Sequence, residues 1–151
     1  MNVFDVELQW DEGDPDGYHV GYKRLGPDLG AEQLGMSVYE LPPGMSVCPY
    51  HWEAGCDEWL FVFRGRPTLR TPEGERTVEP GDTVCFPEGP DGAHHVRNGT
   101  DELVRVALLS TKSAVGIAEY PDSDKVGVWP GGGKNYMLRR SEHLEYWDGE
   151  R

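Results

Sequence analysis

The stretch PYHWEAGCDEWLFVFRG, from Pro49 to Gly65, places polar residues directly before a run of apolar ones. Between Glu58 and Arg64 both alternating sets of positions are apolar, Leu60 and Val62 in one set and Trp59, Phe61 and Phe63 in the other. Successive side chains of a β-strand point to opposite faces, so a strand with this pattern must be covered on both faces. The stretch therefore predicts a strand inside a layered β-structure.

Short segments of similar character lie on both sides of this strand. Turn signals rich in glycine and proline separate nearly all of them; the segments are LGMSVYEL at 34–41 and TLRT, ERTVE, DTVCF, AHHVRN and LVRVALLST between 68 and 111. Short strands at this spacing are typical of a β-sandwich or small barrel, and no window shows a long apolar stripe at helical spacing. The sequence predicts one all-β domain over residues 1–151, with a barrel core at about 34–111.

The two ends of the chain are expected to be irregular extensions of the barrel. VFDVEL, at residues 3–8, predicts an edge strand that is followed by an acidic loop. The segment 112–151 has a looser pattern, but it is too aromatic for disorder, with Tyr120, Trp129, Tyr136, Tyr146 and Trp147. We expect it to pack on the barrel or on a second subunit.

Charge and cysteine content exclude several classes of partner and compartment. The 27 acidic residues against 14 basic ones give a net charge of −13, which repels phosphate backbones and anionic lipids. We therefore expect neither a nucleic acid nor a membrane as partner. Cys48, Cys56 and Cys85 form no C-x-x-C pair, and no apolar leader follows Met1, which favours reduced thiols in a cytoplasmic protein.

Polar residues of the opening stretch are candidates for a metal site. On a strand, His51 and Glu53 share one face, and Glu58 follows a short turn that can bring it back opposite them. A second imidazole arrives from His94 or His95, which point in opposite directions, so that only one of them can enter the site. Such a set fits Fe, Mn, Ni or Zn better than calcium or magnesium. The alternative is the solvated end of an ordinary strand, with Cys56 as a third soft ligand or a small loop residue.

Two motifs of the chain resemble those of the cupin superfamily, small conserved barrels with a metal in the cup. The first motif is matched by Gly44, His51-x-Glu53, Glu58 and Gly65, and the second by Gly81, Pro87, Gly89, His94 and Asn98. The resemblance implies a double-stranded β-helix, or jelly-roll barrel, in which His51, Glu58 and His94 bind a divalent transition metal and His95 does not. Glu53 stands where the family has a second histidine, so it is either a fourth ligand or a catalytic base.

The resemblance leaves the activity open, because this superfamily includes enzymes and binding proteins. We expect a metal-dependent enzyme acting on a polar small molecule, such as an isomerase or a dioxygenase. The alternatives are a non-catalytic module that binds a metabolite or a metal, and a metal-free structural barrel. The resemblance also implies a homodimer. A second subunit or the C-terminal aromatic residues would then cover the outer face of the strand at 59–63.

Overall fold

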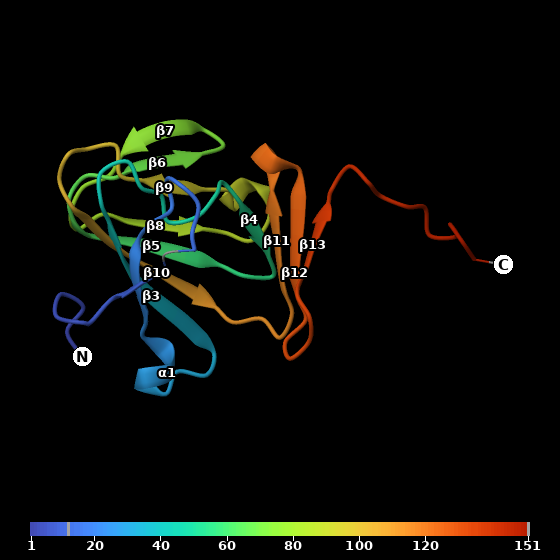
Figure 1. Cartoon of the computed structure of the whole chain (residues 1–151), viewed down its shortest axis with the longest axis horizontal. Helices are drawn as coiled ribbons and strands as arrows, with labels where there is room; N and C mark the ends of the chain where they lie inside the picture. Colours follow the sequence, from blue (N-terminus) through green and yellow to red (C-terminus); the bar gives the residue numbers. More distant parts are fainter. Residues whose placement is uncertain (12, 151) are drawn as a thin grey trace.

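The computed structural model describes residues 1–11 and 13–150, and its regular secondary structure is almost entirely antiparallel strand (Figure 1). The largest sheet has the strand order β1 (Gln9–Trp10), β2 (Gly21–Arg24), β3 (Leu34–Leu41), β10 (Val104–Thr111), β5 (Glu58–Arg64) and β8 (Thr83–Phe86). A second sheet has the order β7 (Gly74–Thr77), β6 (Thr68–Thr71) and β9 (His95–Arg97). The predicted all-β barrel is confirmed.

The third sheet contains most of the C-terminal extension. Its order is β13 (Tyr136–Arg139), β12 (Lys125–Trp129), β11 (Gly116–Tyr120) and β4 (Trp52–Ala54). Within residues 1–11 and 13–150, helical structure is limited to three short pieces, α1 (Gly26–Leu29) and the 3₁₀ turns η1 (Pro90–Gly92) and η2 (Pro121–Ser123). Among the described residues, no helix is both long and apolar enough to cross a membrane.

The main core lies between the first two sheets. In the large sheet Val106 pairs with Val62 and Leu108 pairs with Leu60, so the inward-facing residues form continuous apolar rows. Leu69 and Val96 face them from the second sheet, and both are fully or almost fully buried. Alternate positions of each strand thus build the core, as the period of two in the sequence predicts.

The N-terminal segment covers part of the outer face of the large sheet. Val3 and Val6 pack against the buried cluster of Leu25, Val38 and Ala107, as do Phe61 and Phe63, and the Phe4 and Phe63 ring centroids are 5.8 Å apart. The segment 3–8 is therefore not the predicted edge strand. Val3 and Val6, three residues apart, pack against the same apolar cluster, an arrangement that strict alternation along a strand would not give.

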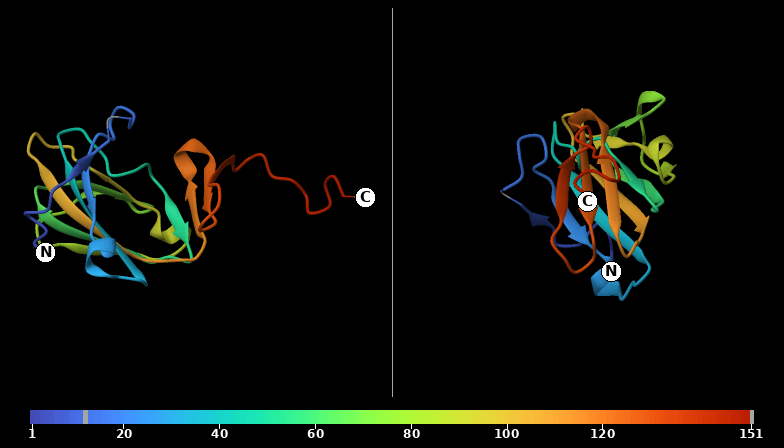
Figure 2. Two further views of the ribbon diagram at one scale, coloured as in Figure 1. Left: turned by 60° about the horizontal axis from the view of Figure 1, so that its bottom comes forward. Right: turned by 90° about the vertical axis from the view of Figure 1, so that its right-hand side faces the viewer.

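The C-terminal extension is attached to the barrel through β11, which pairs with β4. Arg70 of β6 adds a two-pronged ion pair to Asp122, with N to O distances of 2.5 and 3.0 Å. The sequence predicted an irregular extension here, and the structure instead has three short strands. Beyond β13 the chain leaves the body of the molecule (Figure 2), and Leu144, Tyr146 and Trp147 are exposed.

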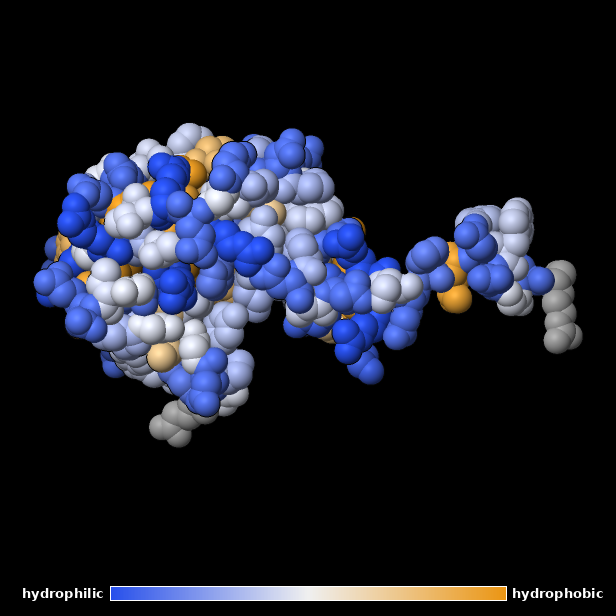
Figure 3. Space-filling model, turned by 90° about the horizontal axis from the view of Figure 1, so that it is seen from above, coloured by the Kyte–Doolittle hydropathy of each residue, from blue (hydrophilic) through white to orange (hydrophobic). Residues whose placement is uncertain are grey.

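Most of the face in Figure 3 is hydrophilic, with small hydrophobic areas between the charged side chains. One of the larger exposed apolar side chains of the barrel is Trp59, which is 42% exposed on the outer face of β5. The N-terminal segment therefore covers this face only in part.

Asn98 ties the end of the second motif to the core. Its side-chain amide donates to the carbonyls of Leu41 and Glu102, at 2.9 and 2.7 Å. The Asn98 side-chain oxygen accepts hydrogen bonds from the backbone N–H and the hydroxyl of Thr100. Asn98 is completely buried, and these bonds satisfy its polar atoms and hold the turn that follows β9.

Candidate metal centre

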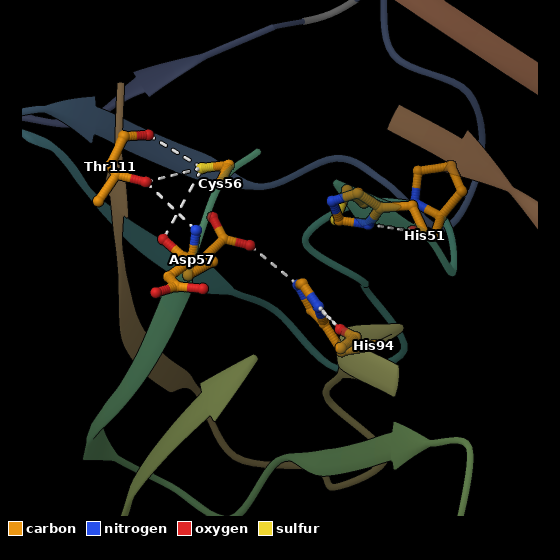
Figure 4. Close-up of polar contacts among 9 residues, drawn as sticks. His51, Cys56, Asp57, His94 and Thr111 are labelled. Carbon is orange, nitrogen blue, oxygen red and sulfur yellow. Dashed lines mark hydrogen bonds and ion pairs between the residues drawn. The ribbon is translucent and has the colours of Figure 1, made fainter. Parts of the chain in front are cut away.

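Three side chains from separate segments of the chain converge in one place. One ligand atom each of His51, Glu58 and His94 lies within 4.8 Å of the others. His51 precedes β4, Glu58 begins β5, and His94 precedes β9. Both histidines are buried, and the side chain of Glu58 is 12% exposed. Figure 4 shows His51 and His94 at this site, apart from the polar contacts that join Cys56, Asp57 and Thr111.

A backbone bridge brings the two histidines together. The N–H of His51 donates to the carbonyl of His94 at 3.2 Å, and the N–H of His94 donates to the carbonyl of His51 at 2.8 Å. The His94 ring also stacks on Phe86, with 3.8 Å between centroids and an interplanar angle of 7°. The backbone and the core together fix where these two rings lie.

Both imidazoles have the same hydrogen-bonding arrangement. Nδ1 of His51 is 3.0 Å from the carbonyl oxygen of Pro49, and Nδ1 of His94 is 2.9 Å from that of Gly92. A carbonyl only accepts, so each Nδ1 carries the hydrogen, and each Nε2 of a neutral ring keeps its lone pair. This is the arrangement by which histidines that bind metals are usually oriented.

The remaining polar atoms show whether this set suits a metal. Nε2 of His94 and Oε2 of Glu58 lie 3.0 Å apart, yet both are buried without a hydrogen-bond partner. Two acceptors at this distance repel, and a cation between them removes the conflict. Two imidazole nitrogens and one carboxylate are a donor set that fits first-row divalent ions.

A family model described as "Cupin domain" matches residues 37–111, which contain both motifs and this cluster. The chain belongs to the cupin superfamily. A search of curated proteins gave no match.

Solved structures share the fold of this cupin, and two of them align over more than nine-tenths of the chain. A sugar phosphate isomerase of the cupin superfamily from Silicibacter pomeroyi is 24% identical, with a TM-score of 0.83, over 98% of this chain and 97% of the other. A candidate sugar phosphate isomerase from Acidithiobacillus ferrooxidans is 22% identical, with a TM-score of 0.81, over 93% and 88%. A polyketide cyclase from Streptomyces resistomycificus is 22% identical, with a TM-score of 0.60, over 74% and 77%.

Glu53 lies outside the three-residue group of this cupin. It is part of β4 and lines a cavity of about 130 Å³ that Cys56 and Ser110 also line. Burial raises the pKa of its carboxyl, and a contact with the Cys56 thiol opposes that rise. A role as fourth ligand or catalytic base, predicted from its place in the motif, stays a prediction.

The other candidates from the sequence have structural partners. The Cys56 thiol donates to the carbonyl of Thr111 at 2.9 Å and is not part of the group, which fits a small residue that anchors a loop. His95 pairs with Arg70 in the second sheet, and burial lowers the pKa of its imidazole.

Two residues that lie beside the centre were not predicted from the sequence to be there. Tyr120, at the end of β11, stacks on His51 with 5.7 Å between centroids and an angle of 22°. Sγ of Cys48 is 3.5 Å from Nδ1 of His51, and burial raises the pKa of this thiol. Tyr120 is distant in sequence and lies outside both motifs, so only strand pairing reveals it. Cys48 lies three residues from His51, and that proximity was the one available signal.

The burial of His51 predicts that the metal-free protein loses stability in acid. Burial lowers the pKa of this imidazole from 6.5 to about 4, so the unfolded chain binds the proton at higher pH than the folded one. The contribution is complete above pH 6.5 and is lost as the pH falls toward 4. At about 1.4 kcal/mol per pH unit, it amounts to roughly 3 kcal/mol.

Urea unfolding of the chelator-treated protein at pH 7, 6 and 5 measures this loss. The matched control is His51→Gln, in which the carboxylates that also titrate in acid are unchanged. The difference in unfolding free energy between the two proteins should shrink or reverse toward pH 5. A difference that is independent of pH would contradict the assignment of a neutral, buried His51.

Proposed function

We propose that this cupin is a metal-dependent enzyme that acts on a polar small molecule, with isomerisation as the favoured reaction type. The observation that carries the proposal is the buried, unpaired pair of acceptors on Glu58 and His94, with His51 beside them. A cavity of about 460 Å³ reaches Glu58, and this volume is within the range of small-molecule sites. Glu58 is the member of the three-residue group that lines this cavity, and access of this kind is what a catalytic ion with an open coordination position requires.

The proposed centre assigns separate tasks to the residues of the chain. A divalent ion bound by His51, Glu58 and His94 would supply Lewis acidity toward a substrate oxygen. Burial raises the pKa of Tyr39, which lines the cavity, to about 12, so its hydroxyl stays protonated and can donate to the substrate. Burial shifts the pKa of the Glu53 carboxyl upward, in the direction of neutral pH. A group that accepts and returns a proton is most effective when its pKa is near the working pH.

The favoured reaction type draws on two of the similar structures, which are described as a sugar phosphate isomerase and a candidate for one. Isomerisation needs no redox partner, only a polarised oxygen and a group that moves a proton. Glu53 and the three-residue group would provide both. The dioxygenase alternative shares the same metal ligands, so the experiment must distinguish the two.

We also infer that the protein works as a cytoplasmic homodimer. The exposed Trp59 and the exposed apolar residues of β13 support a second subunit, and Cys48, Cys56 and Cys85 are all free thiols. The charge of −13 argues against a nucleic acid as partner.

The test combines metal analysis with an activity screen. Protein purified without an affinity tag should contain near-stoichiometric Fe, Mn, Ni or Zn. Hydroxylated aldehydes and ketones should be interconverted without consumption of dioxygen, and a chelator should lower the rate about 100-fold or more until one ion restores it. Dioxygen consumption would favour the dioxygenase. Bound metal without any turnover would contradict the enzyme and favour the binding module.

A further inference from the structure

The cavity that reaches Glu58 is built from the inward-facing rows of the large sheet. Across these strands Arg24 pairs with Ser37, and Ser37 pairs with Leu108. In the next row Gly35 and Glu58 both pair with Ser110. All of these residues line the cavity. The first row thus runs from Arg24 of β2 to β10, and the second joins β3 to Glu58 of the candidate metal centre through Ser110.

Two cationic side chains, those of Arg24 and Lys112, also line this cavity. Arg24 comes from the end of β2, and Lys112 follows β10. Of the described residues that line the cavity, Glu58 is the one carboxylate. If Glu58 binds a divalent cation, the whole cavity has a positive charge, although the protein has a net charge of −13.

Neither cation is neutralised by an acidic neighbour in the part of the chain that the structure describes. No carboxylate lies within 4.0 Å of the Arg24 guanidinium, and the ammonium of Lys112 donates to the backbone carbonyl of Ala31 at 3.0 Å. The adjacent Lys23, in contrast, pairs with Asp28 at 2.7 Å. With 27 acidic residues in the chain, two unpaired cations in one cavity are available for an external anion.

The spacing suits a small molecule that reaches both ends of the cavity. Three strand spacings separate β2 from β5, or about 14 Å between backbones. The long side chain of Arg24 shortens this distance to about the length of a molecule of several heavy atoms. Lys112 follows β10, which adjoins β5, and its ammonium contacts the carbonyl of Ala31 at 3.0 Å. The hydroxyls of Ser37, Tyr39 and Ser110 lie between the ends and can bind polar substituents.

We propose that Arg24 and Lys112 form an oxyanion subsite that binds the phosphate or carboxylate of a polar small molecule whose other end lies at His51, Glu58 and His94. The forked guanidinium and the mobile ammonium are the two side chains best suited to oxyanions. This inference rests on the proposed function for the identity of the cavity as the substrate site. The charge of the subsite itself does not depend on a bound metal.

Calorimetric titration at low ionic strength tests the subsite with three matched probes, glycerol 3-phosphate, glycerate and glycerol. We expect at least one anion to bind more tightly than glycerol by about tenfold or more. Arg24→Gln and Lys112→Gln should each weaken that anion about tenfold, and the double variant about 100-fold. Lys134→Gln, which removes an exposed cation outside the cavity, is the matched control and should bind as the wild type does.

The possible outcomes distinguish a failure of the proposed subsite from a failure of the proposed metal centre. Binding of the phosphate alone, the carboxylate alone or both identifies the anion, and all three results support the subsite when Arg24 and Lys112 are required. Metal content should be unchanged in these variants, and the difference between variant and wild type should persist after chelation. A wild type without metal would therefore contradict the proposed function only. Variants that bind like the wild type, or no anion binding at concentrations on the order of 10 mM, would overturn the subsite.

Discussion

Replacing His94 with glutamine is expected to lower the metal affinity of the protein by about 100-fold or more. Loss of an outer partner of a ligand already weakens metal binding 10- to 100-fold, and loss of the ligand itself removes more. His94 is 2% exposed, and the orphaned Nε2 beside Glu58 is the atom that such an ion would engage. Glutamine preserves much of the volume against Phe86, which limits the change in packing.

Elemental analysis and competition with a fluorescent chelator measure the effect. His51→Ala should show a comparable loss. The matched control is His95→Gln, because His95 is the adjacent residue and pairs with Arg70 away from the group. Equal metal content in wild type, His94→Gln and His95→Gln would show that the group at the end of the cavity does not bind the ion.

Gly92→Ala is expected to reduce the unfolding free energy by about 3 kcal/mol, at the upper end of what added bulk costs in a packed site. A Cβ at Gly92 would be 1.8 Å from the carbonyl oxygen of Pro87, a backbone atom that cannot rotate away. The carbonyl of Gly92 also accepts the Nδ1 hydrogen of His94. Relief of the clash must therefore move η1 and disturb the orientation of His94.

Urea unfolding of the metal-free protein measures the stability, and the metal affinity of the same variant measures the displacement of His94. Gly133→Ala is the control, since the nearest atom to its Cβ would be Cγ of Pro130 at an ordinary 3.4 Å. It should change the free energy by less than about 0.5 kcal/mol. A Gly92→Ala protein with wild-type stability and metal affinity would mean that η1 tolerates the added methyl group and does not position His94.

The strands of the core could be predicted because each carries its own pattern. The alternating segment LGMSVYEL and the doubly apolar segment EWLFVFR match β3 and β5 residue for residue. A period of two is a local property of a half-buried or buried strand, so a short window of sequence contains it. The prediction for the N-terminal segment was wrong because Val3 and Val6 are partly buried by packing against a sheet and not by pairing within one.

The candidate site likewise contains residues that sequence motifs predict and residues that only the tertiary structure brings together. His51, Glu58 and His94 were identified through two motifs of the sequence, and the geometry brings them together without placing Glu53 in their group. Arg24 and Lys112 belong to no motif. They line one cavity because β2, β3 and β10 are neighbours in the large sheet, an order that joins segments separated by most of the barrel.

By itself the sequence determined the class of fold, predicted the positions of the central strands and indicated His51, Glu58 and His94 as candidate metal ligands. The tertiary structure alone decided that Nε2 of His94 and Oε2 of Glu58 are buried without partners and that Tyr120 lies against His51. It also decided that Val3 and Val6 pack on the same buried cluster as Phe61 and Phe63. The physical reason is the distance along the sequence over which each effect acts. Periodicity and side-chain chemistry act over a few residues, whereas the pairing of distant strands depends on the burial that the whole chain achieves against its loop-closure entropy.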